Sequence, residues 1–184
     1  ILNNSGPEIW MNTMSAEQTG VSYENARVNL ELSWRFYQMS EVINNMKTRR
    51  SIRKYKPDMV PEDVLNRIIE AGTYAATGMG KQSPIIIAVT NKEIRDKFSK
   101  MNAEIMGVDS DPFYGAPVVL IVLADKARPT YVYDGSLVMG NLMLAAHAEG
   151  IGSCWIHRAK EEFESAEGKA FLKSLGIEIG RAHV

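Results

Sequence analysis

Apolar residues recur every three or four positions in five stretches of the chain, which is the spacing of one face of a helix. This pattern predicts helices over residues 39–49, from Pro61, from Asn91, over 134–149 and over 160–175. Two of the starts are marked by residue type, because proline favours the first position of a helix and asparagine caps its free amides. The sequence therefore predicts a domain rich in helices.

Short apolar runs lie between these helices. Residues 84–90 and 118–124 are rich in Ile, Val and Leu, and residues 151–156 form a third candidate run. Strands without polar alternation are covered on both faces. Helices on both sides of such a sheet predict an α+β domain with three layers, α-β-α.

The predicted helix over 134–149 carries apolar side chains around nearly its whole circumference, among them Leu137, Leu142 and Ala146. A helix of this kind must be buried on every side. Because a domain of this size can rarely bury a helix completely, we expect this helix to form the core of a homodimer.

The two ends of the chain lack the pattern of the middle. Residues 1–38 keep neither helical nor strand spacing, and they indicate either a disordered or partly helical arm or leader sequence translated in frame before Met39. Residues 179–184 match one reading frame of a common sequencing adapter, so we interpret them as an artefact outside the fold. The predicted domain is then 39–178, cut short at its C-terminal end.

Composition narrows the class of protein. The 184 residues fit a single domain, and their formal net charge of -1 argues against a protein whose main task is to neutralise nucleic-acid phosphates. Cys154 is the single cysteine, which excludes an internal disulfide and a cysteine-rich zinc site. No apolar window approaches 18 residues and no signal peptide is visible, so we expect a cytoplasmic protein without a membrane span.

Several kinds of site find no match in the sequence. Gly78 and Gly80 lack the third glycine of a dinucleotide fingerprint, and no histidine pair has the spacing of metal ligands. No catalytic side chain can be assigned, and Cys154 is interpreted as a buried, unreactive thiol.

A basic segment follows the first predicted helix and has three interpretations. Its three arginines and one hydroxyl lie within five residues: Arg49, Arg50, Ser51 and Arg53. The cations can compensate the negative end of a helix dipole, or they can grip a phosphate with charge-assisted bonds. Nucleic-acid binding is the third interpretation, and the near-zero net charge and the lack of interleaved aromatic residues disfavour it.

Three segments in this order, residues 49–55, 75–84 and 150–157, resemble the nitroreductase family of flavoproteins. The resemblance implies a central mixed sheet whose last strand would lie beyond Glu178. It also implies FMN as cofactor, NADH or NADPH as electron donor, and a homodimer with FMN at the subunit interface, where the second subunit contributes the middle segment. The implied cofactor-binding residues are Arg49, Arg50, Ser51, Arg53, Met79, Gly80, Gln82, Trp155, Ile156 and His157.

The resemblance also implies how these residues act. The amides of Ile156 and His157 would face the flavin ring, whereas Gly80 stands where the family often has asparagine. Electrons would pass by a ping-pong mechanism to a small electron-poor acceptor of the nitroaromatic or quinone type. The alternatives are a flavin-binding protein without turnover and a small nucleic-acid-binding domain that uses the basic residues from Arg49 to Lys56.

Overall fold

The computed structural model describes residues 40–177 and 181–183. The chain divides into two units, Ile1–Asn44 and Asn45–Val184, and the fold and the candidate site belong to the second unit. The expectation of a leader or arm over residues 1–38 lies outside the described residues.

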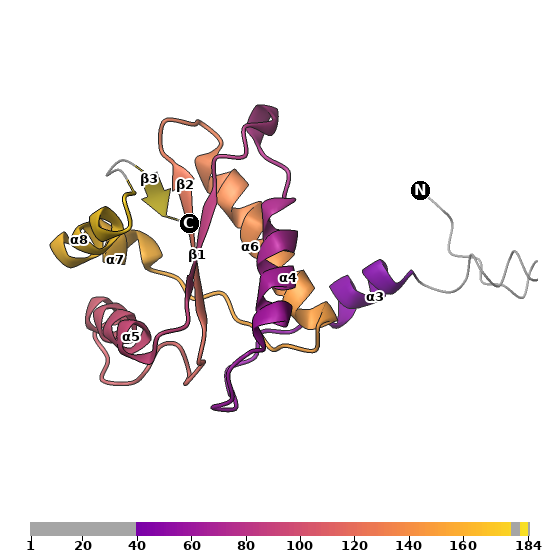
Figure 1. The fold of residues 1–184 in the computed structure, drawn as a ribbon, viewed down its shortest axis with the longest axis horizontal. Coiled ribbons are helices and arrows are strands. Elements are labelled where there is room, and N and C mark those ends of the chain that lie inside the picture. Colours follow the sequence, from indigo (N-terminus) through magenta and orange to yellow (C-terminus); the bar gives the residue numbers. More distant parts are fainter. Residues whose placement is uncertain (1–39, 178–180, 184) are drawn as a thin grey trace, which may run out of the picture. The chain divides into compact units, whose positions relative to one another are not determined.

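The described residues form helices and three short strands (Figure 1). Asn91 caps a helix as expected, because its side chain accepts the amide of Ile94 at 3.0 Å. None of the helices in the described ranges has the length and apolarity needed to cross a membrane. In chain order the elements are α3 (Glu41–Thr48), α4 (Glu62–Thr73), the 3-10 turn η1 (Gly78–Gly80), β1 (Ile85–Val89), α5 (Lys92–Met106), β2 (Val119–Asp125), α6 (Tyr131–Ala148), α7 (Ala159–Glu164), α8 (Ala166–Ser174) and β3 (Arg181–His183).

The sheet has the order β1-β2-β3, and both of its pairings are antiparallel. β1 runs against β2 with Ile85 opposite Leu123. β3 lies within the segment 179–184 that the sequence interpretation assigns to an adapter, and it pairs with the end of β2. The ladders of the described residues are therefore antiparallel, which corrects the expectation of a mixed sheet.

The expected third strand over residues 151–156 is reduced to one isolated parallel bridge, between Ser51 and Ser153. Gly150 and Arg158 both have positive φ angles, 73° and 85°, so the backbone turns at each end of the segment. Within the described residues only Ser153 of this segment pairs with another segment, so the expected strand is corrected to a single bridge.

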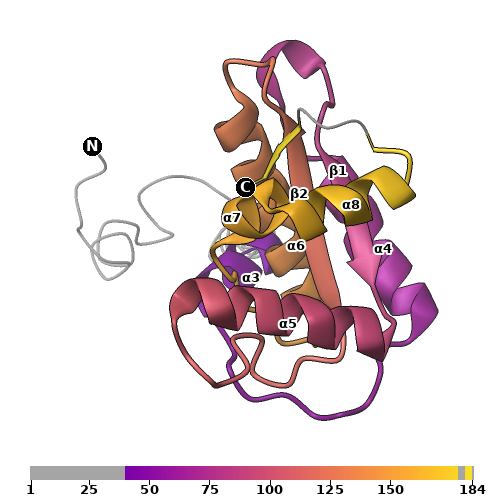
Figure 2. The ribbon, with the colours of Figure 1, turned by 90° about the vertical axis from the view of Figure 1, so that its left-hand side faces the viewer.

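Alternate residues of β1 and β2 face opposite layers of helices. Ile87 packs with Phe98 in a cluster that α5, α7 and α8 complete. Ile86 and Val122 pack with Leu142 in a second cluster beneath α4 and α6. Figure 2 shows α5, α7 and α8 in front of the sheet, with α4 and α6 behind it. The expected three-layer arrangement is confirmed, and it explains why neither strand alternates polar with apolar residues.

Helix α6 buries one face within its own chain and exposes the other. Val138, Leu142 and Ala146 are buried, whereas Tyr133 and Leu137 are 69% and 50% exposed. The predicted burial on every side is therefore incomplete in a single chain. Large apolar side chains exposed together are typical of a protein interface, so the homodimer stays a prediction that this face favours.

The single helix expected over residues 160–175 is divided at Ser165. This residue has an extended backbone, and its hydroxyl caps α8 by accepting the amide of Gly168 at 3.0 Å. Serine competes in this way with the regular bonds of a helix. The helices α7 and α8 cross so closely that a Cβ at Gly168 would lie 2.2 Å from the carbonyl oxygen of Glu162. Helical spacing continues across the break, which is why the sequence pattern did not reveal it.

Candidate functional site

The basic segment runs beside residues 152–153 after it leaves α3. The amide of Ile52 donates to the carbonyl of Ser153 at 3.0 Å, and Ser51 forms its bridge with the same residue. A Cβ at Gly152 would lie 3.1 Å from carbons of the Ile52 side chain, so glycine permits this close approach. Two of the three segments that carry the family resemblance therefore meet in one chain.

The arginines of the basic segment have different surroundings. The guanidinium of Arg50 donates to the carbonyls of Lys47 and Arg49 at 2.7 and 2.8 Å, so it caps the end of α3. The Nη1 atom of Arg49 is buried and has no hydrogen-bond partner within the described residues. A buried donor without an acceptor costs about 1–3 kcal/mol, and more when it is charged. Arg53 is exposed. Arg49 is thus the cation of this segment that most needs an acceptor.

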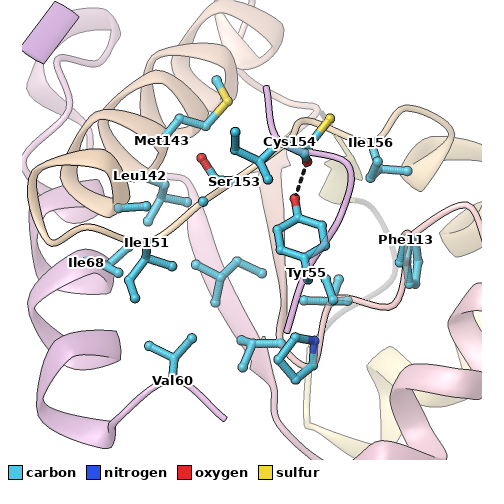
Figure 3. Close-up of a pocket in the computed structure, with 18 of the residues that line it drawn as sticks. Tyr55, Val60, Ile68, Phe113, Leu142, Met143, Ile151, Ser153, Cys154 and Ile156 are labelled. Atoms are coloured by element: carbon cyan, nitrogen blue, oxygen red, sulfur yellow. Dashed lines mark hydrogen bonds between the residues drawn. The ribbon is translucent and has the colours of Figure 1, made fainter. Parts of the chain in front are cut away.

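Tyr55 holds the turn that ends the basic segment. Its hydroxyl donates to the carbonyl of Ile52 at 2.6 Å, which is the dashed line in Figure 3. Burial is the largest influence on this phenol and raises its pKa to about 12, with a further contribution from Cys154. The hydroxyl therefore stays protonated and remains a donor over the range in which most proteins work.

A cavity of about 530 Å³ lies between this turn, β2 and α6. Most of its walls are apolar, and Figure 3 shows Phe113, Leu142 and Ile151 around it together with Tyr55 and Cys154. Its volume lies within the range of small-molecule pockets. The half-buried Cys154 is one of the residues that line this cavity.

Residues 155–157 present backbone donors that no acceptor takes. The amides of Ile156 and His157 have no hydrogen-bond partner within residues 40–177 and 181–183. The carbonyl of His157, by contrast, accepts the side-chain amide of Asn102 at 3.1 Å. Trp155 is partly exposed beside them. Backbone amides left free on a fixed segment are suited to bind an acceptor atom of a ligand.

The third segment of the resemblance is a loop built around η1. Met79 and Gln82 have positive φ angles of 53° and 46°, and Met79 is 81% exposed. The side chain of Gln82 is tied within the loop, since its Nε2 donates to the carbonyl of Thr73 at 2.9 Å and its Oε1 accepts the Thr77 hydroxyl at 2.6 Å. Gly80 follows Met79 in the same exposed turn.

Asp134 anchors this loop to the first turn of α6, and the sequence reasoning did not identify it. It is buried, and its carboxylate accepts the amide of Gly78 at 2.9 Å and the hydroxyl of Thr130 at 3.0 Å. A Cβ at Gly78 would lie 2.3 Å from that hydroxyl oxygen. The available signal was an acidic residue at the start of an otherwise apolar helix.

The loop and the basic segment lie at opposite ends of α6 in one chain. Gly78 bonds to Asp134, whereas Thr48 bonds to His147 at 2.9 Å, next to the basic segment. Positions 134 and 147 are about 20 Å apart along a helix that rises 1.5 Å per residue. A single chain therefore does not bring Met79, Gly80 and Gln82 together with the other predicted site residues.

A buried polar group lies behind residues 155–157, and the sequence reasoning missed it as well. Asn102 of α5 is 1% exposed, and its Oδ1 accepts the Nε of Arg158 at 2.9 Å. Glu162 of α7 is buried beside it. Burial raises the pKa of Glu162 to about 7, against the opposing effects of a hydrogen bond from Asn102 and the charge of Arg158.

The buried carboxyl predicts how stability depends on pH. Because the pKa of folded Glu162 lies above its ordinary value of 4.5, its stabilisation is fully present below pH 4.5 and is lost as the pH rises through 7. Glu162→Gln should match the wild type at pH 4 and exceed its unfolding free energy at pH 8 by up to about 3 kcal/mol. Urea unfolding at both pH values measures this, with exposed Glu161→Gln as control; an equal difference at the two pH values would contradict it.

The sequence is similar to one family over most of its length. The family model described as the nitroreductase family matches residues 46–182. A Methanothermobacter thermautotrophicus protein named as an NADH dehydrogenase/NAD(P)H nitroreductase is 30% identical over 141 residues, which are 72% of this chain and 68% of that protein. A Bacillus subtilis protein named FMN reductase (NAD(P)H) is 34% identical over 90 residues, which are 49% of this chain and 34% of that protein.

Solved structures share the fold. A Bacteroides fragilis nitroreductase crystallised with FMN is 30% identical and matches with a TM-score of 0.70, over 79% of this chain and 84% of that one. A Desulfitobacterium hafniense nitroreductase with bound FMN is 27% identical, with a TM-score of 0.70 over 79% and 86% of the two chains. The family match covers more than half of this chain and includes all three segments described above. The chain belongs to the nitroreductase family.

Proposed function

We propose that this protein is an FMN-dependent oxidoreductase that takes a hydride from NADH or NADPH and passes electrons to a small electron-poor acceptor, of the nitroaromatic or quinone type. One observation carries the proposal. The pairing at Ser153 joins a segment with a buried, unpartnered guanidinium nitrogen, on Arg49, to a segment with two free backbone amides. The bound FMN of the Bacteroides fragilis structure and the name of the Bacillus subtilis relative support the choice of cofactor and donor.

The residues present fit an anionic flavin. Arg49 suits the phosphate, because an anion would supply the acceptor that its buried Nη1 lacks in the described residues. Ser51 and Arg53 are exposed directly after it, and we assign them to the ribityl chain and the pyrimidine edge of the ring. A cation at that edge stabilises the negative charge that reduction leaves there. The free amides of Ile156 and His157 orient the ring, and bound FMN supplies the hydride chemistry.

The proposed site is completed by a second copy of the chain. Within one chain the loop with Met79 and Gln82 lies about 20 Å along α6 from the basic segment, and the exposed side chains Tyr133 and Leu137 leave an apolar face on the same helix. A homodimer that covers this face can bring the loop of one subunit to the basic segment of the other. Both observations thus support a cofactor site shared between subunits.

Removing Arg49 should weaken FMN binding without weakening the fold. Arg49→Ala deletes a charge-assisted bond, so we expect a loss of about 1.5–3 kcal/mol in FMN affinity, which is roughly 10- to 150-fold in Kd. The unfolding free energy of the flavin-free protein should stay equal or rise, because an unpartnered buried donor disappears. Fluorescence titration with FMN measures the first quantity. Lys100→Ala removes the same charge from an exposed position on α5 and should bind FMN like the wild type; equal affinities for all three proteins would contradict the assignment.

Mixed dimers test whether the site is shared. Arg49→Ala damages one half of the site, and Gly78→Ala displaces the loop by a clash with Thr130, so each homodimer should bind FMN poorly. A dimer of one chain of each kind contains one site made only of wild-type residues if the halves come from different subunits. Co-expression with two affinity tags should therefore restore about half of the wild-type FMN content. No recovery in the mixed dimer would contradict a shared site.

Steady-state kinetics test the reaction itself. In a ping-pong mechanism the oxidised donor, NAD+, leaves before the acceptor binds, so initial rates measured against NADH at several fixed quinone concentrations should give parallel double-reciprocal lines. The same form is expected with a nitroaromatic acceptor. Intersecting lines would contradict the mechanism. Bound FMN with no turnover of any donor would favour the alternative of a flavin-binding protein.

A further inference from the structure

Asn102 is placed where its side chain can fix the backbone that carries the two free amides. It lies in the middle of α5 and is 1% exposed, so solvent does not compete for its hydrogen bonds. Its Nδ2 donates to the carbonyl of His157 at 3.1 Å, across a sequence separation of 55 residues. The amide of the same His157 has no partner within the described residues. The carbonyl of His157 is therefore held by a hydrogen bond, whereas its amide is available to a ligand.

Arg158 determines which way the Asn102 amide points. A guanidinium can only donate, so the atom of Asn102 that faces its Nε at 2.9 Å must be the oxygen. The nitrogen is then left to face the carbonyl of His157. A hydrogen bond from Asn102 lowers the pKa of Glu162, and only the amide nitrogen of Asn102 can donate it. The two neighbours thus select the orientation in which Asn102 donates to the backbone.

The backbone at Arg158 is strained, so contacts with the neighbouring residues must keep it in this conformation. Its φ of 85° lies in the left-handed region, where a side chain other than glycine costs about 1–2 kcal/mol. Strained residues persist where the structure around them determines their conformation, and they gather near functional sites. Here the strain lies directly after Ile156 and His157, at the point where the chain turns into α7.

We infer that Asn102 is a positioning residue, whose hydrogen bond to the His157 carbonyl sets the orientation of the Ile156 and His157 amides toward the bound flavin ring. This inference rests on the proposed function and adds a residue to it. We assign Asn102 no contact with the flavin or the substrate. Its effect should therefore fall on the rate of flavin reduction and on the mobility of residues 155–157, and FMN affinity should change little because the phosphate is held elsewhere, at Arg49.

The test removes the side-chain donor of Asn102 and keeps its acceptor oxygen. Asn102→Asp retains an oxygen for Arg158 but cannot donate to the His157 carbonyl when ionised. In the flavin-free protein, hydrogen–deuterium exchange of the backbone across residues 155–158 should become at least tenfold faster. In the FMN-bound protein, stopped-flow reduction at saturating NADH should become at least tenfold slower, with FMN affinity within threefold of the wild type.

Two further variants separate positioning from general damage. Asn141→Asp is the matched control, because Asn141 also donates its side-chain amide to a backbone carbonyl, that of Ala71 at 3.2 Å, but lies on α6; it should leave the reduction rate unchanged. Arg158→Gly relieves the strained φ and releases the Asn102 oxygen, so it should slow reduction even if Asn102→Asp does not fold. Wild-type reduction rates in both Asn102→Asp and Arg158→Gly would overturn the inference, as would faster exchange without slower reduction. A wild-type protein that NADH does not reduce at all would instead contradict the proposed function.

Discussion

The hydrogen bond between the Ile52 amide and the Ser153 carbonyl joins two segments that lie about one hundred residues apart in the sequence. The candidate site depends on it, because it brings the basic segment to the segment with the free amides. Gly152 favours the contact, since a Cβ there would lie 3.1 Å from carbons of the Ile52 side chain. Tyr55 then holds the turn that follows. The geometry of the site thus begins with a backbone contact that favours glycine at one position.

The length of α6 imposes the second constraint. The loop that Asp134 anchors and the basic segment beside His147 lie at opposite ends of this helix. Because they lie about 20 Å apart along one rigid helix, we propose that the cofactor site draws its two halves from two chains. The exposed apolar face of α6 gives a physical reason for two chains to associate there. Assembly and cofactor binding would then be one event, because the interface that buries this face also completes the site.

Sequence patterns predicted the layered core well, because burial on both faces leaves β1 and β2 without polar positions. The same patterns predicted the structure less well where the conformation of a single residue determines it. Ser165 ends α7 with its own backbone conformation, although the apolar spacing continues through it. In α5 the apolar Ile94 is partly exposed, whereas the polar Asn102 is buried. Hydrophobic periodicity cannot reveal a polar side chain on a buried face. The grouping of the site residues came from family resemblance, and Asp134, Asn102 and Glu162 emerged only from their contacts.

If Arg49 and the amides of Ile156 and His157 hold a redox-active flavin, an anaerobic absorbance spectrum of the protein with FMN should show it. The purified protein is saturated with FMN, freed of unbound flavin by gel filtration, and then mixed with NADH or NADPH under nitrogen. The visible flavin bands should stay with the protein and bleach when the donor is added. A colourless protein after gel filtration, or flavin bands that neither donor bleaches, would contradict it.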